Sequence, residues 1–226
     1  MKKEVFRYIH SWENESGNLV FITIPMIHIG SPKYYAEVSA LINSTNMLLE
    51  EGVPSKIDKE LGTYNWIAKK LGLVSQSSSM KIDDDIKREN IDIGKNEFDE
   101  GFSEISVIER VKIKFYKYIM LFVSKQKMFE LLYLCFGYSG EAWLKLVDPS
   151  QHYAYKHDKT PFDLLITNTR DEYVKKNLQS MIDKNIDREY QYNIAIQFGD
   201  EHMPIIYSVL KENGFKWKLE KKINVF

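Results

Sequence analysis

The sequence has 226 residues, of which 44% are hydrophobic and 13% aromatic, and its formal net charge is −1. This composition suits one domain with a sizeable core and excludes a disordered chain. A nearly neutral chain has no basic field for nucleic acid or anionic lipid, so we expect neither as a partner. The single cysteine, Cys135, excludes a disulfide framework within the chain and a zinc cluster built from cysteines.

The first fifty residues predict a hairpin that leads into a βαβ unit. Residues 4–12 (EVFRYIHSW) and 19–26 (LVFITIPM) are rich in β-forming side chains and flank a turn cluster. Ser31 and Pro32 are typical of the start of a helix, and residues 46–52 (NMLLEEG) predict the next strand. The two strands on either side of a crossover helix run parallel and end at the same edge of the sheet.

The middle of the chain predicts helices separated by a polar stretch. A short helix is expected from Tyr64 to Leu71. Residues 75–100 are polar and irregular, and we interpret them as a loop or flap. Residues 103–136 carry apolar side chains at steps of three or four, which predicts two long helices that form an inserted lobe.

The last third predicts helix, strand, helix and strand. Thr169 and Glu172 match a capping box, which places the start of a helix at Thr169. A strand follows at 192–199, then a helix opened by Pro204, and the chain closes with an edge strand (KWKLEKKINVF). Taken together, residues 1–226 predict a single α/β (α+β) domain with a central mixed, largely parallel sheet flanked by helices.

Two strand ends carry a histidine, and a third carries glutamates. His28 follows the strand at 19–26, Glu50 and Glu51 end the strand at 46–52, and His202 follows the strand at 192–199. The carboxyl-end rim of a parallel sheet is where ligands bind in open α/β folds. Two imidazoles and a carboxylate can hold a divalent metal with positions open for water. The same pattern also arises from ordinary polar residues that cap turns.

Several segments, in order along nearly the whole chain, resemble the TraB/PrgY/Tiki (GumN-like) family, which is related more distantly to erythromycin-esterase-like and ChaN-like proteins. That family carries an early and a late GxxH motif. Here IPMIHIGS (24–31) and GDEH (199–202) stand in those places, and LLEEGV is similar to the family's "EG" strand end, which favours Glu51 over Glu50. The segments LGLVSQ, NIDIGKNEF and RDEYVKKNL are also similar to family segments.

The resemblance implies a role for particular residues. His28, His202 and Glu51 would bind a divalent transition metal (manganese, cobalt, iron or zinc) or act as acid and base, and Arg170 would bind substrate or an oxyanion. Substrate-binding residues carried over from the matching segments are the following: Tyr64, Gln76 and Asp92. Two departures stand out, because Pro25 replaces the glycine of the first motif and RDE replaces the family's RN.

Three functions are left open by the sequence. The leading hypothesis is a cytoplasmic, metal-dependent hydrolase that resembles a metallopeptidase and acts on a peptide or a small amide or ester. The second is an inactive protein that binds and sequesters a peptide, in the manner of an immunity or pheromone-shutdown protein. The third is a metal-independent esterase with a histidine as general base. No apolar stretch of signal-peptide or membrane-spanning length is present, and the oligomeric state, monomer or homodimer, is left open.

Overall fold

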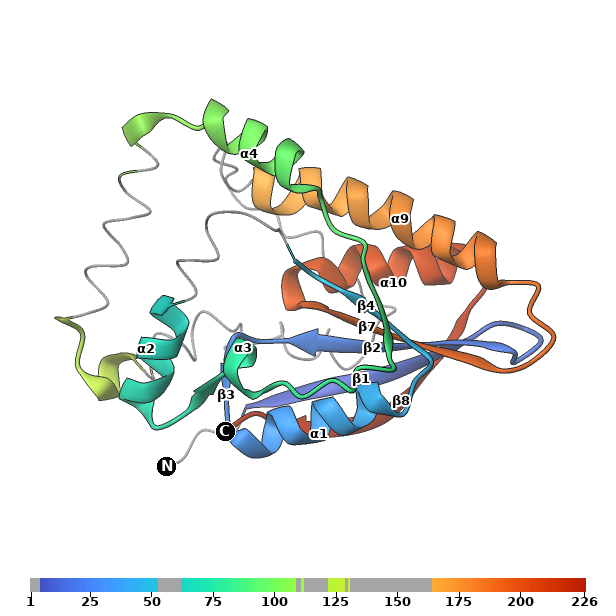
Figure 1. Cartoon of the computed structure of the whole chain (residues 1–226), viewed down its shortest axis with the longest axis horizontal. Coiled ribbons are helices and arrows are strands. Elements are labelled where there is room, and N and C mark those ends of the chain that lie inside the picture. Colours follow the sequence, from blue (N-terminus) through green and yellow to red (C-terminus); the bar gives the residue numbers. More distant parts are fainter. Residues whose placement is uncertain (1–4, 53–61, 109–110, 112–121, 129, 131–163) are drawn as a thin grey trace.

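A mixed sheet forms the centre of the protein (Figure 1). The structure is a computed structural model that describes residues 5–52, 62–108, 111, 122–128, 130 and 164–226. The order of the strands is β6-β4-β7-β2-β1-β8. Their bounds are as follows: β1 Phe6–Glu13, β2 Leu19–Met26, β4 Met47–Glu50, β6 Lys87–Asn90, β7 Tyr192–Gly199 and β8 Lys216–Asn224. Strands β6, β4, β7 and β2 are parallel, and β1 is antiparallel to β2 and β8. This confirms the α/β class with a mixed, largely parallel sheet.

Three predicted features of the sheet are confirmed. Strands β1 and β2 form the antiparallel hairpin, β2 and β4 run in the same direction, and β8 lies at one edge of the sheet. One feature was not predicted: β7 lies between β2 and β4 and pairs in parallel with both. Strand β2 is therefore buried at nearly every position, which explains its continuous apolar run.

Helix α1 (Pro32–Asn43) covers one face of the sheet (Figure 1). It starts as predicted, because the hydroxyl of Ser31 accepts a hydrogen bond from the backbone N–H of Tyr34 and Pro32 occupies the first turn. Its apolar side packs with Ile24 of β2 and Leu48 of β4 in one core cluster.

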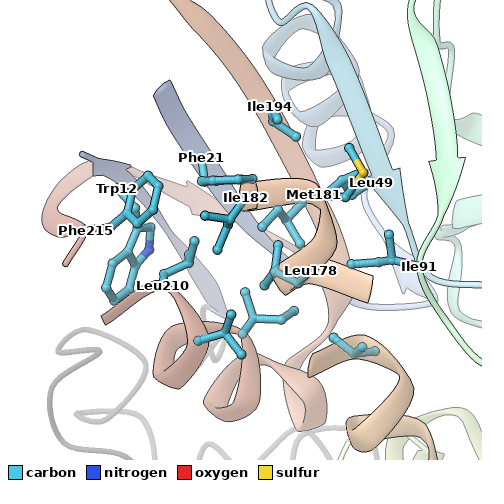
Figure 2. Packing of buried hydrophobic residues seen from close by; sticks show 14 of the residues in the cluster. Trp12, Phe21, Leu49, Ile91, Leu178, Met181, Ile182, Ile194, Leu210 and Phe215 are labelled. Carbon is cyan, nitrogen blue, oxygen red and sulfur yellow. The ribbon is translucent and has the colours of Figure 1, made fainter. Parts of the chain in front are cut away.

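The opposite face is covered by α9 (Arg170–Asn185) and α10 (Met203–Glu212). Figure 2 shows Leu178, Met181 and Ile182 of α9 among strand side chains such as Phe21 and Ile194. Apolar helix faces packed on both sides of the sheet hold the strand ends, and therefore the rim, in fixed positions.

The segment predicted as a loop or flap contains regular structure. It holds α3 (Gln76–Ser79), strand β6 and most of α4 (Lys95–Glu104), and β6 pairs in parallel with β4. The prediction was wrong because β6 (KREN) is an edge strand that is mostly exposed. Strand β6 forms because its backbone pairs with β4, and an exposed strand of this kind needs no alternating apolar side chains. Its sequence therefore gives no strand signal. A second, two-stranded sheet joins β3 (Ile29–Gly30) to β5 (Val74–Ser75) beside α2 (Gly62–Leu71).

Helix α9 begins at Arg170, directly after Thr169 as predicted, but the Thr169 side chain does not form the predicted cap. Thr169 has helical backbone angles, and a π-helical turn, Leu165–Thr169, runs directly into α9. The capping pattern does not end the helix here, because Leu165 is buried and anchors the preceding turn. Most of the predicted lobe at 103–136, including Cys135, lies outside the described residues. In the described part of the chain, no helix has the length and apolar character needed to cross a membrane.

Candidate functional site

The carboxyl ends of the parallel strands meet at one rim, as predicted. Strand β2 ends two residues before His28, β4 ends directly before Glu51, β7 ends three residues before His202, and β6 ends two residues before Asp92. In Figure 1 this is the side toward which the arrow of β2 points, where α2 lies and where α9 and α10 begin. The sheet order therefore gathers side chains that are far apart in the sequence.

Glu51 is held by two hydrogen bonds. Its Oε1 accepts from Nη2 of Arg170 at 2.6 Å, and its Oε2 accepts from the backbone N–H of Gly199 at 2.6 Å. Burial alone would raise the pKa of Glu51. The charges of Arg170 and His202 and these two hydrogen bonds outweigh burial, so the pKa is lowered and the carboxylate stays ionised. Glu50, by contrast, pairs with the exposed Arg88. The structure thus turns Glu51, not Glu50, toward the rim.

Arg170 connects Glu51 to a second carboxylate. Its Nε donates to Oδ1 of Asp92 at 2.9 Å, and its Nη2 contacts the other oxygen of Asp92. The side chains of Arg170 and Asp92 are 8% and 0% exposed. Burial would lower the pKa of Arg170, but hydrogen bonds and charges from Asp92 and Glu51 raise it, so the guanidinium remains charged. A buried charge of this kind is tolerated because it is fully paired.

His202 is oriented by a carboxylate that was not predicted from the sequence. Its Nδ1 lies 2.6 Å from Oδ1 of Asp171, and its side chain is 3% exposed. A carboxylate accepts hydrogen bonds, so Nδ1–H is the donor in this pair and the ring is oriented with Nε2 toward the rim. That Nε2 faces Oε1 of Glu51 at 3.8 Å. The one sequence signal for Asp171 was the RDE that stands in place of the family's RN.

His28, Tyr64 and Gln76 lie together at the outer side of the rim. The exposed ring of His28 stacks on Tyr64 of α2, with 4.5 Å between ring centroids and 30° between ring planes. The backbone N–H of Gln76 donates to the carbonyl of His28 at 3.0 Å. The pKa of Tyr64 is raised first by burial and then by the negative charges of Glu51 and Glu201.

The predicted metal ligands are brought together only in part. His202 Nε2 and Glu51 Oε1 face each other, whereas His28 contacts Tyr64. Among the described residues, no group of three or more His, Cys, Asp and Glu side chains has the arrangement of a metal site. Next to His28, the Ile27 carbonyl accepts a hydrogen bond from the hydroxyl of Tyr35 at 2.8 Å. In this arrangement the three predicted ligands do not form one group.

A second ion pair lies at the turn that carries His202. Arg7 of β1 is fully buried, and its Nη2 contacts Oδ2 of Asp200. Burial raises the pKa of Asp200 to about 6, although the charge of Arg7 opposes that shift. Arg7 lies in a segment that was predicted as a strand, and no sequence pattern indicated that it would pair with Asp200.

Comparison of the chain with protein-family models, with curated proteins and with solved structures finds no match. The resemblance to the TraB/PrgY/Tiki family therefore rests on the motifs alone. The geometry at the rim stands independently of that resemblance.

Proposed function

We propose that the rim is the catalytic centre of a hydrolase that cleaves an amide or ester bond in a peptide or small molecule, with His202 as general base. The observation that carries this proposal is the pairing of His202 Nδ1 with Asp171, which leaves Nε2 as an acceptor beside Glu51. A carboxylate that fixes the tautomer of a histidine is a recurring arrangement for proton transfer.

The proposed reaction uses these groups in order. Nε2 of His202 accepts a proton from a water molecule as the water oxygen bonds to the substrate carbonyl carbon. The imidazolium, stabilised by Asp171, then gives this proton to the leaving nitrogen or oxygen as the carbon–heteroatom bond breaks. Glu51 offers an acceptor oxygen that helps to orient the same water, since it lies 3.8 Å from Nε2.

The contacts of Arg170 favour a positioning role over the oxyanion role implied by the resemblance. Its guanidinium is 8% exposed and is neutralised by Glu51 and Asp92. Its charge keeps Glu51 ionised and in place, which is what a water-orienting carboxylate requires.

A metal-dependent hydrolase is a second candidate, favoured by one observation. Metal-ligating histidines commonly donate their other ring N–H to a carboxylate, as His202 does to Asp171. His202 and Glu51 would then be ligands, and manganese, cobalt, iron or zinc would supply Lewis-acid chemistry when bound. Because His28 stands apart, we derive no step through a metal.

The test is turnover of a library of peptides, small amides and esters by the purified protein, with and without a chelator. The general-base proposal expects turnover that survives chelation and falls at least about a hundredfold in His202→Ala. His10→Ala serves as the control histidine, because His10 lies in β1 and its ring contacts Tyr207 and Trp217. Circular dichroism checks that both variants fold. Undiminished turnover in folded His202→Ala contradicts the proposal, and loss on chelation with one bound metal per chain favours the second candidate.

A further inference from the structure

The side chain of Arg7 is fully buried at the end of β1 that lies at the rim. Strand β1 is paired on both sides, with β2 and with β8, so Arg7 stands on a rigid part of the sheet. Because β1 runs antiparallel to β2, the first residues of β1 lie beside the last residues of β2. Arg7 therefore carries a buried positive charge close to the strand ends that form the site.

The ion pair of Arg7 with Asp200 connects two strands that are not neighbours. Nη2 of Arg7 contacts Oδ2 of Asp200, the residue that directly follows β7. The strand order places β2 between β1 and β7, and the last residues of β2 and β7, Met26 and Gly199, are paired in register. The ion pair thus bridges the end of β2 and ties the residue after β7 to β1.

Asp200 also belongs to the backbone turn that carries His202. It is the first residue of the 3₁₀ turn Asp200–His202, and its carbonyl accepts a hydrogen bond from the backbone N–H of Met203. The ring of His202 contacts Asp171 through Nδ1 and meets the ring of Phe198 edge-on, with 6.0 Å between ring centroids. The ring is therefore held by α9 and β7, whereas the backbone beneath it is held through Asp200.

We propose that Arg7 is a positioning residue for His202 and acts through Asp200. By holding Asp200, Arg7 fixes where the turn lies at the end of the sheet. The position of the turn in turn sets the distances from the His202 ring to Asp171 and Glu51. A misplacement of about 1 Å in a catalytic group can lower a rate about a hundredfold. The kinetic part of this inference rests on the proposed function, whereas the placement of the ring can be measured without turnover.

The competing interpretation is that the ion pair contributes to stability alone. Two variants remove it from opposite ends: Arg7→Met deletes the cation and keeps an unbranched apolar side chain, and Asp200→Asn deletes the carboxylate charge. The control is Ile42→Val, because Ile42 is fully buried near the end of α1, at the opposite end of the sheet from the rim. It lowers stability through core packing without a change at the turn. Urea unfolding and circular dichroism verify the fold of each variant.

The first readout is the Nδ1–H proton signal of His202 in protein labelled with ¹⁵N-histidine. We expect this signal to shift or disappear in both Arg7→Met and Asp200→Asn, and to be unchanged in Ile42→Val. Arg7→Lys keeps the charge but not the planar fork of donors, so its effect should be smaller than that of Arg7→Met. If Arg7→Met does not fold, Arg7→Lys and Asp200→Asn carry the test. A wild-type signal in the folded variants of this pair overturns the proposal.

The second readout is steady-state kinetics. We expect kcat to fall about ten- to a hundredfold in Arg7→Met with KM nearly unchanged, because the substrate does not contact Arg7. Since Arg7 acts through Asp200, the double variant should be no slower than the slower single variant. Losses that multiply in the double variant contradict action through Asp200, and an unchanged kcat in folded Arg7→Met contradicts positioning.

Failure of this inference and failure of the proposed function are distinguishable. A His202 signal that responds to Arg7→Met in a protein without hydrolytic turnover contradicts the hydrolase but supports the positioning of the ring. Turnover that depends on His202 but not on Arg7 supports the hydrolase and overturns the role of Arg7.

Discussion

Nδ1 of His202 lies 2.6 Å from Oδ1 of Asp171, although the two residues are 31 positions apart in the sequence. The pair joins the first turn of α9 to the turn that precedes α10, two helices that pack on the same face of the sheet. The orientation of the imidazole is thus built into the helix packing, which leaves Nε2 for chemistry at the rim.

The first prediction concerns Asp171. Asp171→Asn keeps the shape of the side chain but removes the negative charge that stabilises the imidazolium and fixes its tautomer. We expect turnover to fall about a hundredfold or more, with little change in the free energy of unfolding, because the Asp171 side chain is 29% exposed. Steady-state kinetics and urea unfolding measure the two effects. Unchanged turnover in the variant would show that the pair has no part in proton transfer.

The second prediction compares two neighbouring glutamates. Glu51→Gln weakens the partly buried hydrogen bond to Arg170, so we expect a loss of about 1–3 kcal/mol in the free energy of unfolding. Glu50→Gln affects an ion pair whose arginine, Arg88, is 53% exposed, and should cost about 0.5 kcal/mol or less. Urea unfolding at pH 7 tests the difference. Equal losses for the two variants contradict the placement of Glu51.

Glu51→Gln and Glu50→Gln should also differ in how their stability depends on pH. The pKa of Glu51 in the folded protein lies below its ordinary value of 4.5, so its contribution to stability is present above pH 4.5. That contribution is lost as the pH falls further, through the folded-state pKa. The decline in stability below pH 4.5 should therefore be shallower in Glu51→Gln than in Glu50→Gln, as measured by unfolding across a pH series. Parallel declines would contradict the lowered pKa.

A third prediction concerns Arg170. Arg170→Lys keeps the positive charge, but one ammonium cannot reproduce the paired contacts with Asp92 together with the contact to Glu51. Arg170→Met leaves the fully buried Asp92 carboxylate without its cation, and we expect a loss of about 3 kcal/mol or more in the free energy of unfolding. The lysine variant should fall between wild type and methionine. A methionine variant as stable as wild type would rule out the buried triad.

A fourth prediction concerns Asp200, whose shift has the opposite sign. Its pKa is raised from 3.8 to about 6 by burial, so the folded protein binds this proton more tightly than the unfolded chain. Asp200 therefore destabilises the fold above pH 6, and this cost is relieved as the pH falls from 6 toward 3.8. Asp200→Asn should lack that part of the pH dependence, whatever its absolute stability. Thermal unfolding between pH 4 and 7 tests this, and an unchanged slope would contradict it.

The elements that could be predicted from the sequence are those with strong local signals. The hairpin, α1 with its Ser31 cap and the parallel direction of β2 and β4 follow from alternation, capping and the βαβ rule. Because strand direction fixes the rim, Glu51 and His202 could be placed there in advance. Their placement needed only short-range patterns and one topological rule.

Features that depend on long-range pairing could not be predicted. Strand β6 has no apolar alternation, because its partner β4 supplies the backbone hydrogen bonds. Asp171 and Arg7 are ordinary charged residues until the fold brings His202 and Asp200 to them. His28 lies on the rim, but its ring stacks on Tyr64, a contact between β2's end and α2 that no spacing rule encodes.

The measurement that tests the central claim most directly is nitrogen NMR of the His202 ring in protein labelled with ¹⁵N-histidine, assigned by comparison with His202→Ala. We expect a protonated Nδ1 whose proton signal shows a strong hydrogen bond, and an Nε2 without a proton at neutral pH. In Asp171→Asn this pattern should be lost. A His202 ring with its proton on Nε2, or one whose signals do not respond to the Asp171 variant, would contradict a base held by Asp171.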